Sequence, residues 1–252
     1  MSTITKNIVS SINSNDADKF LMLISNISLN ELKDVNYDEI DSKLMNSKQF
    51  SLKHKLIYAK YYNRSIYRQI LEETVSNIYG NDYDALLFVA RAEEYFRKQI
   101  LDVLVVRTLD NDRKEQFIYQ LQSSNLYEKY IESLMNGNDS VAKILFAIRF
   151  GFIDAFYQSS LNLAKVIVNT DVFKGSFSGK SDVLMELSKN TTDRDTLEYI
   201  EKSLEKVVSE ETKDFYDGTY AELGIKKDNS KEKESTIKRK LSYCLNMIKR
   251  KF

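Results

Sequence analysis

Apolar residues in this chain recur at steps of three and four, which is the spacing of one face of an α-helix. The chain shows almost no alternation with the period of two that is typical of half-buried β-strands. It also has no proline, the residue that disfavours a helix interior most strongly, by about 3 kcal/mol. These patterns predict an all-α protein of roughly nine to eleven helices, arranged as a multi-helix globular bundle or as a degenerate α-solenoid.

Three stretches predict single long helices, over 51–79, 82–109 and 139–168. The third is apolar nearly all round, which is typical of a helix in the centre of a domain. Gly151 near its middle predicts a close crossing of another helix. A glycine-containing stretch over 169–179 is the candidate hinge. It divides the chain into a helical main domain, 1–170, and a helical C-terminal subdomain, 171–252, unless the whole chain is one domain.

Rare residue types exclude several classes of protein. One cysteine cannot form a disulfide framework, and one cysteine with one histidine cannot supply a zinc site. No stretch of the ~18 residues that a membrane span needs is free of charge, and the first residues lack the pattern of a secretory signal. We therefore expect an intracellular, cytoplasmic protein without a cofactor. The many Asn, Lys, Ile and Tyr residues are typical of an AT-rich genome, so a virus or host-associated bacterium is a plausible source, with the host cytoplasm as the location.

Charge is balanced overall but unevenly distributed. The chain carries 37 basic and 37 acidic residues, so its formal net charge is zero. Residues 42–71 include seven basic residues and no acidic one, and residues 226–252 include ten basic and three acidic ones. Residues 193–217 include nine acidic residues against four basic ones. Such blocks predict charged surfaces that bind complementary ones, within one molecule or between copies.

One candidate binding surface is the basic, tyrosine-rich segment 51–79. Cations contact phosphates and aromatic rings stack on bases, so this segment predicts binding of nucleic acid or of another anionic partner. The same pattern also fits a solvated basic face over tyrosines that pack in a core. The candidate residues are Lys53, Tyr58, Lys60, Tyr61, Arg64 and Arg68.

The second candidate surface is the C-terminal helix, predicted over 235–252. Its apolar residues form one stripe, and basic residues cover the rest. A basic amphipathic helix can bind an anionic membrane surface, a partner groove or nucleic acid, or it can simply close the core of its own domain. The cations that would make the contact are Lys238, Arg239, Lys240, Lys249, Arg250 and Lys251.

Candidate catalytic features are few. The segment 175–181 partly matches a phosphate-binding loop, but three residues rather than four separate Gly175 from Gly179, which favours an interhelical loop. His54 is the single histidine, so any catalytic mechanism that needs a histidine base must use it. It lies between two lysines, and a position on the helix surface is the favoured interpretation. Cys244 lies on an apolar stripe, as a small buried hydrophobe does.

Carboxylates are the remaining catalytic material. The pair Asp82 and Asp84 has the spacing of a metal-binding motif but stands at a predicted helix start, where capping is the favoured role. Glu93 lies on an apolar stripe, so burial would raise its pKa and suit it to acid–base chemistry. The favoured alternative is an ion pair with Arg97, four residues on. We therefore predict no catalytic residue and no metal site.

These observations favour a non-catalytic interaction protein that binds a protein partner, including a second copy of itself, through segregated charged helical surfaces. The alternative is a protein that binds single-stranded RNA or other nucleic acid. The all-α layout with a basic face and a terminal arm looks like that of nucleoproteins of segmented negative-strand RNA viruses, but no motif carries the similarity, and the zero net charge is unlike theirs. An enzyme that uses carboxylates and a metal is the third hypothesis.

Overall fold

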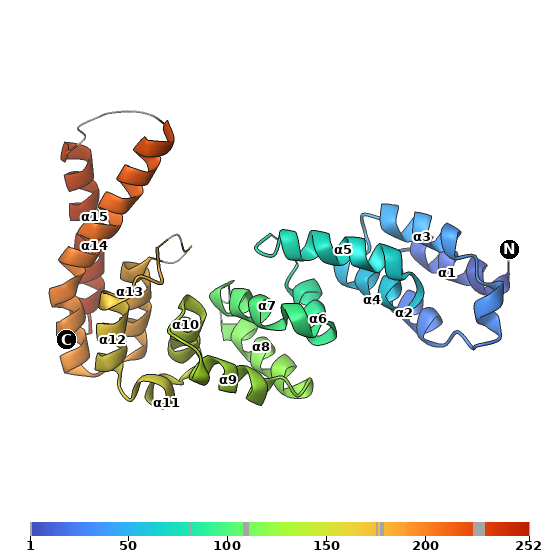
Figure 1. The fold of residues 1–252 in the computed structure, drawn as a ribbon, viewed down its shortest axis with the longest axis horizontal. Coiled ribbons are helices and arrows are strands. Elements are labelled where there is room, and N and C mark those ends of the chain that lie inside the picture. Colours follow the sequence, from blue (N-terminus) through green and yellow to red (C-terminus); the bar gives the residue numbers. More distant parts are fainter. Residues whose placement is uncertain are drawn as a thin grey trace. The chain divides into compact units, whose positions relative to one another are not determined.

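The structure is a computed structural model that describes residues 2–80, 82–107, 111–174, 176, 179–223 and 230–251. These residues form fifteen α-helices and one short 3-10 helix, η1, and no strand (Figure 1). The all-α prediction is confirmed, whereas the predicted number of helices is too low. The reason is that each of the three long predicted helices is broken.

Two compact units make up the chain, Met1–Leu104 and Val105–Phe252. The first contains α1 (Thr3–Asn13), α2 (Ala17–Ser25), η1 (Glu31–Asp34), α3 (Tyr37–Asn46), α4 (Leu52–Tyr62), α5 (Arg64–Ser76), α6 (Tyr83–Ala92) and most of α7 (Glu94–Arg107). The second contains α8 (Asn111–Ser123), α9 (Tyr127–Asn136), α10 (Val141–Phe150), α11 (Ile153–Tyr157), α12 (Ser160–Asn169), α13 (Lys180–Asn190), α14 (Arg194–Leu223) and α15 (Ser230–Lys249).

This division differs from the expected boundary at 170/171. Helix α12 packs against both α13 and α14. Helices on the two sides of the expected hinge therefore pack against each other.

The helices predicted over 51–79 and 82–109 each break at one extended residue. At Asn63 (φ −141°, ψ 91°) the backbone N–H ends α4 on the Ala59 carbonyl, and the side-chain oxygen accepts the Ile66 N–H to begin α5. At Glu93 (φ −126°, ψ 107°) the backbone N–H likewise ends α6 on the Val89 carbonyl. Both breaks use a residue that is neither glycine nor proline.

The helix predicted over 139–168 is three helices, α10, α11 and α12. Gly151 takes the left-handed conformation (φ 77°) that ends α10, and apart from its own local backbone no atom lies within 4 Å of where its Cβ would be. Its role is thus to end a helix, and the prediction of a close helix crossing there is wrong. Gln158, also left-handed (φ 67°), ends α11 in the same way.

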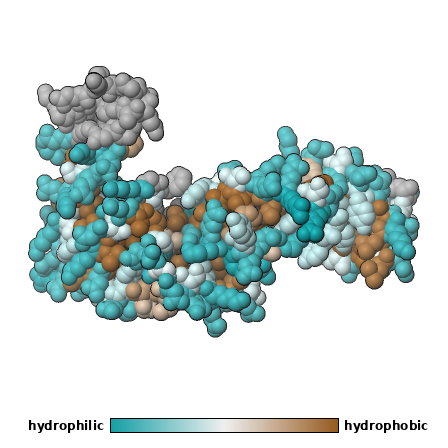
Figure 2. Space-filling view, in the orientation of Figure 1, coloured by the Kyte–Doolittle hydropathy of each residue, from teal (hydrophilic) through white to brown (hydrophobic). Residues whose placement is uncertain are grey.

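Each unit has its own apolar core. In the first unit, Phe20 and Phe50 pack edge to face at 5.1 Å beside buried aliphatic side chains of α1 and α3. In the second, α10 is buried along seven consecutive positions, from Ala142 to Ile148, as its all-round apolar pattern predicts. Hydrophilic residues cover much of the visible face, and patches of hydrophobic residues show among them (Figure 2).

Basic side chains close the carboxyl ends of six described helices. The last carbonyls of a helix lack partners within it and carry partial negative charge, so cations bind there favourably. Only seven glycines and no proline are available to end helices in the usual way. The contacts are Lys55 to Met45, Lys60 to Ala92, Arg97 to Ala90, Arg149 to Val105 and Val106, Lys143 to Gly137, Lys180 to Val168, and Lys251 to Lys189.

Candidate interaction surface

The basic segment of the first unit folds into α4 and α5, and part of it is internal. Tyr58 is 1% exposed in the core, so it cannot stack on a base and lies outside any surface. Burial raises the pKa of its hydroxyl, and the neighbouring Asp41 raises it further. Lys53 is half-buried at the start of α4. The six candidate residues therefore do not form one exposed face.

Lys60 and Tyr67 both contact the carboxylate of Glu93. The Lys60 Nζ lies 3.2 Å from Glu93 Oε1, and the Tyr67 hydroxyl donates to the same oxygen at 2.6 Å. Burial alone would raise the pKa of the Glu93 carboxyl, but the hydrogen bonds from Tyr67 and Lys60 outweigh burial and lower that pKa. The carboxyl is thus held ionised, which does not suit a general acid. The ion pair expected for Glu93 forms with Lys60, while Arg97 pairs with Glu94.

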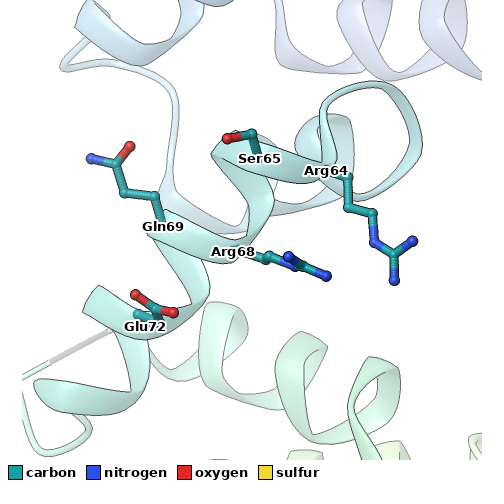
Figure 3. A pocket seen from close by; sticks show the side chains of 5 residues that line it. All are labelled: Arg64, Ser65, Arg68, Gln69 and Glu72. Carbon is teal, nitrogen blue, oxygen red and sulfur yellow. The ribbon is translucent and has the colours of Figure 1, made fainter.

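The candidate cations that are exposed lie on one side of α5. Arg64 and Arg68 are exposed and lie one helical turn apart, and Tyr61, at the end of α4, is 72% exposed. Within the described residues neither guanidinium has an ion pair or a hydrogen bond. Both arginines extend to the same side of α5, while Gln69 extends to the other (Figure 3). Together with Ser65, Gln69 and Glu72 they line a shallow, open depression of about 410 Å³. We call the side of α5 that carries Arg64 and Arg68 the arginine face.

His54 has a local structural role. Its Nδ1 lies 2.7 Å from the hydroxyl of Ser51, the residue before α4, and its ring packs edge-on against Phe50. Burial, followed by the charge of Lys53, lowers the pKa of the imidazole. Within the described residues no carboxylate hydrogen-bonds the other ring nitrogen, so the Ser–His–carboxylate arrangement of hydrolases is not assembled.

The C-terminal helix α15 closes the core of the second unit. Cys244 and Ile248 are buried on its apolar side, and α15 packs against α13 and α14. Burial raises the pKa of the Cys244 thiol, which disfavours the reactive thiolate. Cys244 and Ile248 of the apolar stripe thus pack within the second unit, whereas Ile237, Leu241 and Leu245 are half-buried.

Some basic side chains of the C-terminal segment form ion pairs or hydrogen bonds, and others are exposed without such contacts. Lys240 pairs with Glu211 of α14 at 3.1 Å, and Lys238 pairs with Glu234 one turn before it. Lys251 closes the end of α13 through the Lys189 carbonyl. The exposed residues without such contacts are Arg239, Lys249 and Arg250. The Lys240–Glu211 pair joins the basic block 226–252 to the acidic block 193–217, so these blocks meet within one molecule.

The segment compared with a phosphate-binding loop holds a carboxylate of the chain itself. Glu211 accepts hydrogen bonds from the Ser181 backbone N–H at 3.0 Å and from its hydroxyl at 2.5 Å, at the amino end of α13. A Cβ on Gly179 would lie 2.7 Å from Glu211 Oε1, so the glycine makes room for this carboxylate. Gly175 lies outside the described residues. The amino end of α13 is thus occupied by a carboxylate of the chain, and sequence reasoning missed the role of Glu211.

Two remaining predictions concern metals and membranes. Asp82 accepts the Asp84 backbone N–H at 2.8 Å, as expected of a residue that caps α6. Across the described ranges no three His, Cys, Asp or Glu side chains gather into a group that could hold a metal ion. Of the helices in those ranges, none combines the length and apolar character that crossing a membrane requires.

Comparison with known proteins gives no family assignment. No protein-family model, no curated protein and no solved structure matches this chain. Function is therefore inferred from the chemistry of the exposed surface.

Proposed function

We propose that this chain is a non-catalytic α-helical interaction protein that binds an acidic protein surface through the arginine face of α5. The observation that carries the proposal is the contrast between neighbouring cations. Lys55 and Lys60 each close the end of another helix, whereas Arg64 and Arg68 are exposed and lack partners among the described residues. Arginine forms paired hydrogen bonds with carboxylates, which makes it well suited to such a contact.

A protein partner is favoured over single-stranded nucleic acid by what α4 and α5 leave exposed. Stacking surfaces need several accessible rings along a groove of cations. Here Tyr58 and Tyr67 are buried and Lys60 is paired with Glu93, which leaves Tyr61, three positions before Arg64 in the sequence, as the exposed tyrosine of α4 and α5. One exposed tyrosine near two arginines has the composition of the few residues that dominate protein–protein binding energies.

The test is comparative capture from the native cells. Tagged wild-type protein is compared with a variant that carries Arg64→Glu and Arg68→Glu, after circular dichroism shows that both are folded. The matched control, Lys19→Glu with Lys33→Glu, changes the net charge equally at exposed lysines elsewhere in the first unit. We expect a protein that the wild type and the control retain and the arginine variant loses. Identical captured proteins for all three would contradict the proposal.

The nucleic-acid alternative is measured with the same variants. A single-stranded RNA oligonucleotide is titrated at about 50 mM and about 200 mM salt, because phosphate contacts weaken steeply as salt rises. We expect no binding that depends on Arg64 and Arg68. Salt-sensitive RNA binding that the arginine variant loses, together with no captured protein, would replace the proposed function by the alternative.

A further inference from the structure

The arginine face has a complementary surface on the same chain, the acidic pair Glu201 and Glu205 of α14. We infer that the arginine face of one copy binds this acidic pair on a second copy, so that the protein associates with itself. The inference rests on the proposed function, because it uses the same two arginines, and it names their partner.

Like Asp195 and Asp214, the acidic pair has no ion pair or hydrogen bond within the described part of α14. Asp195, however, lies in the first turn of the helix, and the acid one turn before Asp214 is paired, so neither forms a second unpaired couple. Glu198 pairs with Arg194 at 3.1 Å and with Lys202 at 3.9 Å, and Glu210 pairs with Lys206 at 3.8 Å. Glu211 is held by Ser181 and Lys240, as described above. Among the described residues Glu201 and Glu205 have no such partner. Glu205 is exposed and Glu201 is partly exposed.

The two surfaces match in spacing as well as in sign. Arg64 and Arg68 are four residues apart on α5, and Glu201 and Glu205 are four residues apart on α14. Residues at this spacing have Cβ atoms about 5–6 Å apart on one side of a helix. Each pair brings like charges together, which disfavours its own helix. Contact between the two pairs removes both unfavourable arrangements at once.

A second exposed acidic pair, Glu128 and Glu132 of α9, is the natural comparison. It has the same spacing, and neither carboxylate has a partner among the residues described. Glu128, however, lies in the first turn of α9, where a negative charge stabilises the positive end of the helix. The charges of Glu201 and Glu205 fall beyond the first turn of α14 and have no such local role. The α9 pair therefore serves as the matched control.

The experiment measures self-association of the full chain by sedimentation velocity over a range of protein concentrations and at two salt concentrations. We expect the wild type to associate at low salt and less at high salt. One variant carries Arg64→Glu and Arg68→Glu, and the other carries Glu201→Lys and Glu205→Lys. Each alone brings like charges together and should weaken association roughly tenfold or more. The control with Glu128→Lys and Glu132→Lys should associate like the wild type.

Mixing the two variants gives the decisive result. In a mixed pair, the unchanged arginines of one variant meet the unchanged glutamates of the other. The new glutamates on α5 meet the new lysines on α14, so both contacts join opposite charges. We therefore expect the mixture to recover the association that each variant has lost. A contact within one chain would not be recovered by mixing, so a mixture that stays monomeric would overturn the inference. A wild type that is monomeric at every concentration would overturn it too.

Failure of the inference and failure of the proposed function are distinguishable. If the wild type is monomeric but the arginine variant still loses a different captured protein, the arginine face binds another partner and only the inference fails. If the arginine variant changes neither self-association nor the set of captured proteins, both fail.

Discussion

Lys60 of α4 and Glu93, the residue between α6 and α7, form an ion pair with 3.2 Å between Nζ and Oε1, although 33 positions separate them in sequence. The same Nζ lies 3.1 Å from the Ala92 carbonyl oxygen at the end of α6. One lysine therefore neutralises a carboxylate and closes a helix in the same place. The sequence pattern predicts that Lys60 belongs to a binding surface, but in the structure its side chain stabilises contacts within the first unit.

Replacing Lys60 with alanine should destabilise the first unit. The change removes the ion pair and the helix-closing hydrogen bond together. Both side chains are about 30% exposed, so water weakens the pair. We expect a loss of about 1–2 kcal/mol in the free energy of unfolding, measured with a chemical denaturant. The control is Lys98→Ala, whose pair with Asp102 lies along one helix and should contribute below about 0.5 kcal/mol. Equal losses would contradict the assigned role.

The contribution of Glu93 should depend on pH in a defined direction. Its folded-state pKa lies below the ordinary value of 4.5. Stability from this group is therefore fully present above the unfolded-state pKa and is lost as pH falls through the lowered folded-state pKa. We expect the wild type to exceed Glu93→Gln in stability at neutral pH, with a difference that shrinks below pH 4.5. Urea unfolding of both proteins at several pH values measures it, and a constant difference would refute the assignment.

The helical stripes were predictable from the sequence, but the helix breaks were not. An apolar stripe with a period of 3.6 residues shows which side of a helix faces a core, but not where the helix ends. The stripe of 51–79 continues past Asn63 and therefore gives no sign of the break. One of the two side-chain contacts of Asn63 joins it to a residue that is distant in sequence. Its side-chain amide donates to the buried Asp41 at 2.7 Å while its oxygen caps α5. Tertiary contacts of this kind leave no trace in a local pattern.

The candidate surface was predictable in part, for a similar reason. The spacing of residues along a helix shows which cations share one side, and it correctly placed Arg64 and Arg68 together. It cannot tell which tyrosines face a core, since a tyrosine suits both places, and Tyr58 was assigned to the surface although the core of the first unit covers it. The role of Lys60 depends on Glu93, and that of Lys240 on Glu211. Both partners come near only when the helices pack.

Arg149 should be among the most sensitive positions of the second unit. Its side chain is 4% exposed and forms two hydrogen bonds with Glu186, at 2.7 and 2.9 Å, while it also donates to the Val105 and Val106 carbonyls. Arg149→Ala leaves the carboxylate and both carbonyls without this donor. We expect a loss of about 3–5 kcal/mol in the free energy of unfolding.

A double-mutant cycle with Glu186→Ala separates the ion pair from the helix end. If the pair and the carbonyl contacts both matter, the double variant should be more stable than the sum of the single losses predicts, yet less stable than the wild type. Additive losses would show that Arg149 and Glu186 act independently.

Gly179 and Glu211 should be energetically coupled through the space that they share. In Gly179→Ala the new methyl group would lie 2.7 Å from the Glu211 carboxylate, which Ser181 and Lys240 hold in place. We expect a loss of about 1–2 kcal/mol in the free energy of unfolding, because the carboxylate must move away from its donors. Thermal unfolding measured by circular dichroism reports the change.

The same substitution in a Glu211→Ala background should have the opposite sign. The backbone of Gly179 has a φ of −75°, which alanine adopts without strain. With the carboxylate gone, alanine should stabilise the protein by about 0.4–1 kcal/mol, because it restricts the unfolded chain. This reversal is specific to the shared space. A Gly179→Ala loss that persists without Glu211 would show instead that α13 needs glycine there for its own backbone.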